Sequence, residues 1–254
     1  MTMKNKRTPV VCAVQMGASL AVFAQEKVPL KIDVPKPGFT GGIVNEVRDY
    51  PFLDPHPNDK PRPPIEVPIG CDKLLSHGCK VTSSEDDPII GELSYITDGD
   101  KQYDAASYVE LKQGLQWIQI DLGSEQEIYA VCIWHHWGEY FPGLRTGRFY
   151  RSVICQISND PEFADGVVTV FNNDHRNLAQ LGMSTDLEYF ESPYGRPFAV
   201  DAVKGRYVRC YSHGNNRNEM NHYTEVEVYG RPIERKQKAE ADNAEVRRKK
   251  AEEE

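Results

Sequence analysis

The sequence predicts an all-β fold, a sandwich or barrel, on three observations. From residue 71 to 230, short runs rich in β-branched and aromatic residues are separated by turn clusters at roughly regular spacing, a pattern typical of sandwiches and barrels. No helix-length amphipathic pattern interrupts these runs. The stretches on either side differ sharply in composition, so we expect one β-domain over residues 70–231.

Alternation of apolar and polar residues predicts the strands in order, because successive side chains of a strand point to opposite faces. The runs are 126–137, 152–157, 167–171, 206–211 and 224–229. In the first run the alternation places Ile128, Ala130, Cys132 and Trp134 on one face, which we expect to face the core. In the last two runs the residues expected to point inward are Val208, Cys210, Val226 and Val228.

The two flanks of the domain predict little packed structure. Residues 26–69 contain ten prolines, and proline blocks helices and removes ladder donors, so an extended linker that lies on the domain or leads to it is expected. Residues 234–254 carry seven acidic and seven basic residues with only Ala and Val as apolar content. We expect this charged tail, within residues 232–254, to be helical or disordered.

The N-terminus predicts an export signal over residues 1–25. A basic start precedes a mostly apolar stretch at 9–23 and a small-residue cleavage site near Ala24, which is the order of a signal peptide. A buried N-terminal helix is the alternative. Cleavage would place the mature chain outside the cytoplasm, secreted or periplasmic. It would also remove three basic and no acidic residues, taking the net charge from −8 to −11.

This negative balance disfavours a nucleic acid or an anionic membrane as the partner, since both attract basic surfaces. No later stretch is apolar enough for a membrane span.

Five cysteines follow residue 25. Cys132, Cys155 and Cys210 occupy apolar strand positions and are expected in the core, whereas Cys71 and Cys79 either bridge each other or stay free. No CxxC pair is present, so a zinc or redox site is unsupported.

Three segments in order carry a resemblance to a known family. They are Ser-Tyr-Ile-Thr-Asp-Gly-Asp at 94–100, Trp-Ile-Gln-Ile-Asp-Leu-Gly at 117–123, and Tyr-Thr-Glu-Val-Glu-Val-Tyr-Gly at 223–230. In this order and spacing the chain resembles the discoidin, or coagulation factor 5/8 type C, domains. These galactose-binding-like domains include the family 32 carbohydrate-binding modules. The resemblance implies a discoidin-like jelly-roll β-sandwich and a family that is mostly non-catalytic.

The acidic turn is the candidate metal site. Asp98 and Asp100 flank Gly99, and a hard cation such as calcium prefers carboxylate and carbonyl oxygens from a tight loop. The resemblance implies a structural calcium ion held by the side chains of Asp98 and Glu225, carbonyls of Tyr95 and Tyr103, and an oxygen of Asp100. The family often has Thr where Tyr103 stands. In the alternative interpretation the two aspartates cap a turn and Glu225 lies on an edge strand; Glu227 is a further candidate ligand.

Candidate ligand-binding residues lie on predicted loops. Trp137 and Tyr140 are candidate platforms on which a sugar ring stacks, while His213, Asn216 and Arg217 suit the donors and acceptors of a carbohydrate. A second polar loop at 172–177 is the next candidate. In each case the alternative is structural: rings closing the end of the sandwich, or ordinary turn residues. His135 and His136 are expected on opposite faces of a strand, which disfavours a shared metal.

Taken together, the sequence favours a non-catalytic binding module that recognises carbohydrate or a glycosylated surface. A protein-binding scaffold is the first alternative. A divergent hydrolase or lyase using a histidine and a carboxylate near 135–141 and 213–219 is the second. No nucleophile-elbow, phosphate-loop, dinucleotide or zinc-protease motif occurs, so enzyme activity has little support.

Overall fold

The computed structural model describes residues 25–35, 52–54, 60–102, 107–136 and 148–233, together with residues 247 and 249. Between residues 25 and 233 the described chain forms twelve strands and one short 3-10 helix. The predicted all-β class is therefore confirmed. The predicted signal peptide and nearly all of the charged tail lie outside the described residues. In the part described, no helix has the length and apolarity to span a bilayer.

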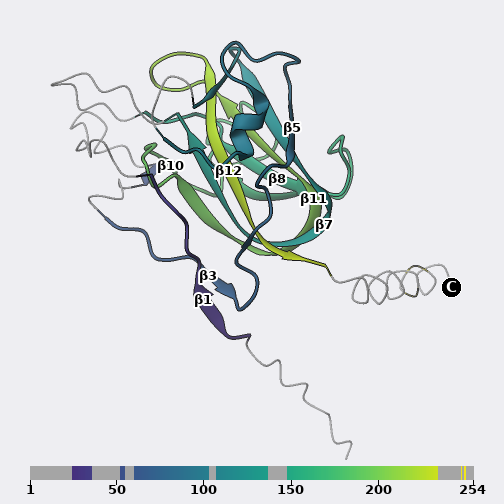
Figure 1. Ribbon diagram of the computed structural model, residues 1–254. Helices are drawn as coiled ribbons and strands as arrows, with labels where there is room; N and C mark the ends of the chain where they lie inside the picture. Colours follow the sequence, from purple (N-terminus) through teal and green to yellow (C-terminus); the bar gives the residue numbers. More distant parts are fainter. Residues whose placement is uncertain are drawn as a thin grey trace, which may run out of the picture.

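The elements follow one another as short strands around a few long ones (Figure 1). In chain order they are β1 (Lys27–Pro29), β2 (Leu53–Asp54), β3 (Glu66–Pro68), β4 (Lys73–Leu74), β5 (Lys80–Ser83), η2 (Leu93–Thr97), β6 (Val109–Leu111), β7 (Leu115–His135), β8 (Ile154–Ser158), β9 (Val168–Asn172), β10 (Glu188–Tyr189), β11 (Arg196–His213) and β12 (Asn221–Pro232).

Two long strands, β7 and β11, build both halves of the sandwich. The first half of β7 pairs with β5 and with the second half of β11, which continues into β8 and β9. The second half of β7 pairs with the first half of β11 and with β12, which also carries β4 and β6. The sheet thus folds over on itself as an antiparallel jelly-roll sandwich, and the register shifts near residues 199–207 accompany the bend.

The main core lies between these two halves. Ile118 and Ile120 of β7 contribute from one half, while Val226 and Val228 of β12 contribute from the other. Val208 and Cys210 also point inward, as the alternation predicts. Every one of these side chains is fully buried. Removing this apolar surface from water contributes more to the stability of the fold than any other interaction.

The predicted inward face of β7 is confirmed for Ile128 and wrong for Ala130, Cys132 and Trp134. Ile128 lies in the main core with Val131 and Ile133, but Ala130 packs in a second apolar cluster on the opposite face. On that same outer face the Cys132 Sγ lies 3.9 Å from the carbonyl of Tyr194. The reason is a β-bulge: Tyr229 faces Ala130 while Gly230 faces Ile128, and one inserted residue reverses the phase of the strand.

Trp134 shares this outer face and is nevertheless fully buried. Its indole Nε1 donates to the carbonyl of Pro193 at 3.0 Å. A β-carbon at Gly195 would lie only 2.6 Å from the indole ring, so the chain can pass over Trp134 only where a side chain is lacking.

The described parts of the proline-rich lead-in lie on the domain. β1 pairs antiparallel with β3, and their apolar side chains cover the outer face of β7 and β12 around Ala130 and Tyr229. β2 pairs in parallel with β10. The lead-in therefore supplies a cover for a sheet face that would otherwise expose apolar surface.

All five cysteines after residue 25 are free thiols. Cys71 and Cys79, for which the sequence left a bridge open, do not pair. Cys155 and Cys210 face each other across β8 and β11 in the main core, with their sulfur atoms 3.8 Å apart. Cys132 is equally buried, although it lies on the outer face.

Candidate functional site

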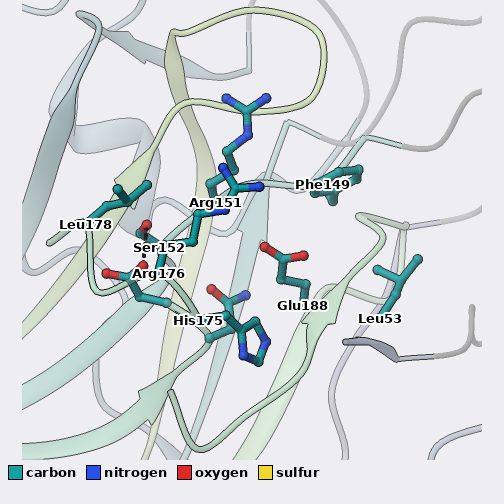
Figure 2. A pocket seen from close by; sticks show the side chains of 10 residues that line it. Leu53, Phe149, Arg151, Ser152, His175, Arg176, Leu178 and Glu188 are labelled. Carbon is teal, nitrogen blue, oxygen red and sulfur yellow. Dashed lines mark hydrogen bonds between the residues drawn. The ribbon is translucent and has the colours of Figure 1, made fainter. Parts of the chain in front are cut away.

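A pocket of about 240 Å³ is the candidate binding site (Figure 2). It lies among the segment before β8, the loop after β9, and the pair of strands β2 and β10. Apolar, aromatic and polar side chains all line it: Leu53, Phe149, Arg151, Ser152, Asn173, Asp174, His175, Arg176, Leu178 and Glu188.

Hydrogen bonds from side chains to backbone fix the loop after β9. The Asn173 Oδ1 accepts the backbone N–H of Val153 at 2.7 Å. The two carboxylate oxygens of Asp174 accept the Ser152 hydroxyl at 3.0 Å and the backbone N–H of Ala179 at 2.8 Å. Short polar side chains of this kind replace the backbone ladder in a turn. The loop is thus held against the segment at 151–153 and presents His175 and Arg176 to the pocket.

The lead-in forms the opposite wall. Leu53 lies opposite Glu188 in the parallel pair, and the backbone N–H of Glu188 donates to the carbonyl of Phe52 at 2.8 Å. The Phe52 ring packs on the His175 ring with their centroids 4.6 Å apart. Residues 123 positions apart (Phe52 and His175) and 135 positions apart (Leu53 and Glu188) therefore meet at this wall.

The charges of the pocket differ in exposure. Asp174 is 2% exposed and Glu188 is 9% exposed. By contrast, Arg176 is an exposed residue, and the Arg151 side chain keeps a third of its surface exposed while pairing with Glu219 at 3.3 Å. Two buried nitrogen atoms of the pocket residues, Asn173 Nδ2 and His175 Nε2, have no hydrogen-bond partner in the described structure.

The three predicted ligand residues on the late loop lie next to this pocket but do not line it. His213 donates its backbone N–H to the carbonyl of Arg151 at 2.8 Å. The Asn216 Oδ1 accepts the backbone N–H of Phe149 at 3.1 Å. The backbone N–H of Arg217 donates to Asn215 Oδ1 at 2.8 Å. This loop therefore supports the strip of chain that carries Phe149 and Arg151.

The predicted stacking residues Trp137 and Tyr140 lie outside the described residues. Sequence reasoning pointed to the 172–177 loop, and Asn173 to Arg176 do line the pocket. It missed Leu53, Phe149, Arg151 and Glu188, which come from three other segments. The alternation of Phe149 and Arg151 with buried Tyr150 was a local signal that these two side chains share the outward face.

A buried network of histidines and acids lies behind the pocket strip. His135 Nδ1 is 2.8 Å from a carboxylate oxygen of Glu191, and His222 Nε2 is 2.9 Å from one of Glu110. The Tyr150 hydroxyl is 3.0 Å from His222 Nδ1. Burial, with help from nearby Arg148, lowers the pKa of His222 to about 3. The three rings and Glu191 are buried, Glu110 is half-buried, and all five side chains form hydrogen bonds, which suits a structural network.

Burial and Arg148 likewise lower the pKa of neighbouring His136 to about 4. Its ring packs on Tyr108 with centroids 4.3 Å apart. His135 stacks instead on Tyr150 at 4.3 Å, so the two adjacent histidines face different partners, as expected for a strand.

The acidic turn joins the last strand through one carboxylate. The backbone N–H of Gly99 donates to Glu225 Oε2 at 3.0 Å, and Gly99 has a φ of 90°, a conformation that favours glycine. Glu225 is fully buried, and its Oε1 has no hydrogen-bond partner in the described structure. Burial is the main cause that raises the pKa of Glu225 to about 8.

The two aspartates differ in availability. Asp100 accepts the backbone N–H of Gln102 at 2.9 Å and the Ser107 hydroxyl at 2.9 Å, one on each oxygen. Asp98 uses one oxygen to accept the backbone N–H of Asp100 at 2.8 Å. Asp98 and Glu225 thus keep a carboxylate oxygen that could bind a cation, whereas the Asp100 side chain acts as a turn residue.

Glu227 is not available as a metal ligand. Lys101 Nζ donates to Glu227 Oε1 at 2.6 Å, and the Tyr229 hydroxyl donates to Oε2 at 2.6 Å. The same ammonium lies 5.0 Å from the centre of the Trp134 ring. Tyr95 is half-buried in the middle of η2, and Tyr103 lies outside the described residues. Within the described ranges, no group of three or more His, Cys, Asp or Glu side chains could hold a metal.

Comparison with known proteins finds likeness in solved structures alone. No protein-family model and no curated protein matches the chain. The family 32 carbohydrate-binding module of AlyQ, solved with 4,5-unsaturated mannuronic acid, is 20% identical; the match covers 60% of this chain and 95% of that one, with a TM-score of 0.41. The likeness is one of fold.

Two further structures match at the same level. Chitosan-binding module 1 of a chitosanase/glucanase from Paenibacillus sp. IK-5 is 21% identical, covering 62% of this chain and 99% of that one, with a TM-score of 0.43. A family 32 module of Clostridium perfringens in complex with GalNAc-β-1,3-galactose is 14% identical, covering 62% and 100%, with a TM-score of 0.43. These modules belong to the family that the sequence resembles. Sequence identities and TM-scores this low do not assign a ligand to this chain.

Proposed function

We propose that this chain is a non-catalytic binding module whose pocket holds a carbohydrate. The observation that carries the proposal is the mixed lining of the pocket, in which Phe149, Leu53 and Leu178 stand beside hydrogen-bonding side chains. A sugar presents an apolar C–H face and a set of hydroxyl groups, and such a lining can satisfy both. Asn173 Nδ2 is a donor, and His175 Nε2 is a donor or an acceptor according to its tautomer, so sugar hydroxyl groups can satisfy both atoms.

A glycan array tests this function directly. The purified chain is screened, and the best hit is titrated against Arg151→Ala, Asn173→Ala and the loop variant Arg217→Ala. Losing one hydrogen bond to a ligand costs on the order of 1–3 kcal/mol, which weakens binding by about tenfold or more. We expect this loss for both pocket variants. The melting temperature should be unchanged in Arg151→Ala and lowered in Asn173→Ala, which also removes the hydrogen bond to the Val153 N–H.

The variants also distinguish two places where the sugar could bind, the pocket and the late loop. Loss of binding in Arg217→Ala alone would place the sugar on the late loop with His213 and Asn216, as the sequence predicts. An array without hits, together with a protein that co-purifies stoichiometrically, would favour the scaffold function. Release of sugar products from a polysaccharide would favour an enzyme.

A protein partner is the second candidate because apolar side chains are exposed around the pocket. Leu178, which lines the pocket, is 44% exposed, and Phe52, which packs on the His175 ring, is 46% exposed. Exposed apolar side chains grouped on one surface are typical of interaction sites. A glycosylated protein would use both the pocket and this rim.

The proposal includes a structural calcium ion and export. Asp98 and Glu225 would hold the ion through their side chains. The fully buried Oε1 of Glu225, which has no hydrogen-bond partner in the described structure, supports this site. Bound calcium would place a positive charge next to the ionised Glu225 carboxylate. Export rests on the N-terminal pattern of residues 1–25. It is tested by sequencing the N-terminus of the protein recovered outside the cytoplasm, where a start near residue 25 is expected.

A further inference from the structure

We infer that the pocket recognises an acidic sugar residue, with its carboxylate bound by Arg151 and Arg176. This inference rests on the proposed carbohydrate function and adds the chemical class of the ligand. Both arginines line the same pocket, and Figure 2 shows their side chains on it together with Glu188. A guanidinium group matches a carboxylate with two parallel hydrogen bonds, which makes arginine the preferred partner of planar anions.

Both arginines are available to a ligand. The pair between Arg151 and Glu219 spans 3.3 Å, and the two side chains are 33% and 57% exposed. Ion pairs so exposed to water contribute little, so a ligand carboxylate can displace Glu219 at small cost. Arg176 is exposed and forms no ion pair within the described ranges.

The two acids that line the pocket are less exposed than its two arginines. Asp174 has both oxygens engaged by Ser152 and Ala179, so it is bound within its own loop. Glu188 is 9% exposed. An incoming ligand therefore meets the two arginine side chains before it meets these carboxylates.

Two buried nitrogen atoms of pocket residues have no hydrogen-bond partner in the described structure. Asn173 is fully buried, and its Oδ1 is bound by the Val153 N–H, which fixes the amide so that Nδ2 is the free end. That nitrogen lacks a partner, as does His175 Nε2. A buried donor without a partner is costly, and the hydroxyl and carboxylate oxygens of a uronic acid would satisfy it.

Size and net charge limit the ligand to a short one. At about 240 Å³ the pocket is below the roughly 300–1,000 Å³ of sites for drug-sized ligands, so it suits a single sugar ring. The chain has a net charge of −8, which repels a long polyanion at a distance. The pocket therefore suits the terminal residue of a chain rather than the middle of a charged polymer.

Matched sugars test the inference. Trisaccharides of galacturonate, mannuronate and guluronate are titrated calorimetrically into the intact chain, each beside the same trisaccharide with its carboxyl groups reduced to alcohols. We expect at least one acid form to bind tenfold or more tighter than its reduced form. Arg151→Gln and Arg176→Gln should each remove most of that preference, while Lys204→Gln, an exposed charge on β11, should leave it unchanged.

Each outcome of the titrations supports or overturns the acidic-sugar inference. Equal binding of acid and reduced forms would overturn the acidic class and leave the carbohydrate function standing. Binding of none of the six sugars also overturns the inference, and the glycan array then decides the proposed function separately. A preference for acids that survives both arginine variants at unchanged melting temperature would place the carboxylate elsewhere and defeat the assignment.

Discussion

Asp54 and Arg196 lie 142 positions apart in the chain and form an ion pair that ties the proline-rich lead-in to β11. Arg62 donates to the same Asp54 oxygen at 3.1 Å and to the carbonyl of Gly195 at 3.2 Å. One carboxylate thus holds two guanidinium groups, directly beside Leu53 in the pocket wall. The lead-in is therefore part of the candidate site.

Replacing Asp54 by Ala should loosen this wall. Two partly buried arginines would lose their shared partner, at a cost of about 1–3 kcal/mol in unfolding free energy. Hydrogen exchange at Leu53 and Asp54 should rise, and sugar binding should weaken. Asp87→Ala, an exposed acid remote in sequence from this cluster, is the control. Unchanged exchange at 53–54 in Asp54→Ala would show that the β2–β10 pairing alone holds the segment.

Glu225 should make stability depend on pH and calcium. Its pKa is about 8 in the folded chain and near 4.5 when unfolded. The folded state therefore retains a proton that the unfolded state loses, so the contribution of Glu225 to stability is highest below about pH 4.5 and falls as pH rises towards 8.

In the presence of a chelator, the melting temperature should therefore fall as pH rises towards 8. Calcium should offset this fall by binding the ionised form of Glu225. Glu225→Gln should remove both the pH contribution and the calcium response, and Asp98→Ala should remove the calcium response. A melting temperature that ignores calcium in the unmodified chain at pH 8 would reject the metal site. Asp100→Ala serves as the comparison, since its carboxylate is engaged within the turn.

Buried His136 and His222 should act in the opposite direction. Their pKa values are about 4 and about 3 in the folded chain, against about 6.5 when unfolded. The unfolded state takes up protons first as pH falls, so the contribution of these two histidines to stability is present above pH 6.5 and is lost towards pH 4 and below. Urea unfolding between pH 7.5 and 4.5 measures the slope. His222→Gln should flatten it, whereas the exposed control His77→Gln should not.

Lys101 should be needed to keep Glu227 buried. The two side chains are 9% and 4% exposed, and removing one partner of a buried pair costs about 3–5 kcal/mol. Lys101→Met should therefore lower the unfolding free energy by that amount, and Glu227→Gln in the same chain should recover part of it. A loss that the second change does not reduce would assign the effect to packing on Trp134.

The buried thiols should be inert in the native protein. Cys132, Cys155 and Cys210 are fully buried, and burial raises the pKa of Cys132 well above its usual range. A maleimide reagent followed by peptide mapping should label them only after denaturation. Half-buried Cys79 is the internal comparison and should react first of these four. Rapid native labelling of Cys155 or Cys210 would mean that the core opens locally.

The sequence allowed the class, the inward residues of β11 and β12, and the Gly99 turn to be predicted, because each depends on local alternation or on one backbone conformation. The phase of β7 could not be read in this way. Residues 130–134 are all apolar, since the strand is covered on both faces, so alternation gives no direction there and the bulge at Tyr129 decides it. The pocket could not be predicted for another reason. It brings together Leu53, Phe149 and Glu188, which lie close to one another only because of the topology of the fold.

The sharing of β7 and β11 between the two halves of the sandwich has a consequence for folding. Neither half can complete its hydrogen bonds while the other is unfolded, because each long strand ends in the opposite half. Closure also depends on very distant pairs, such as the Val228 N–H with the Ser76 hydroxyl, 152 positions apart. Chains dominated by such contacts fold slowly, over milliseconds to seconds, and the domain should unfold as one cooperative unit without a stable half-sandwich.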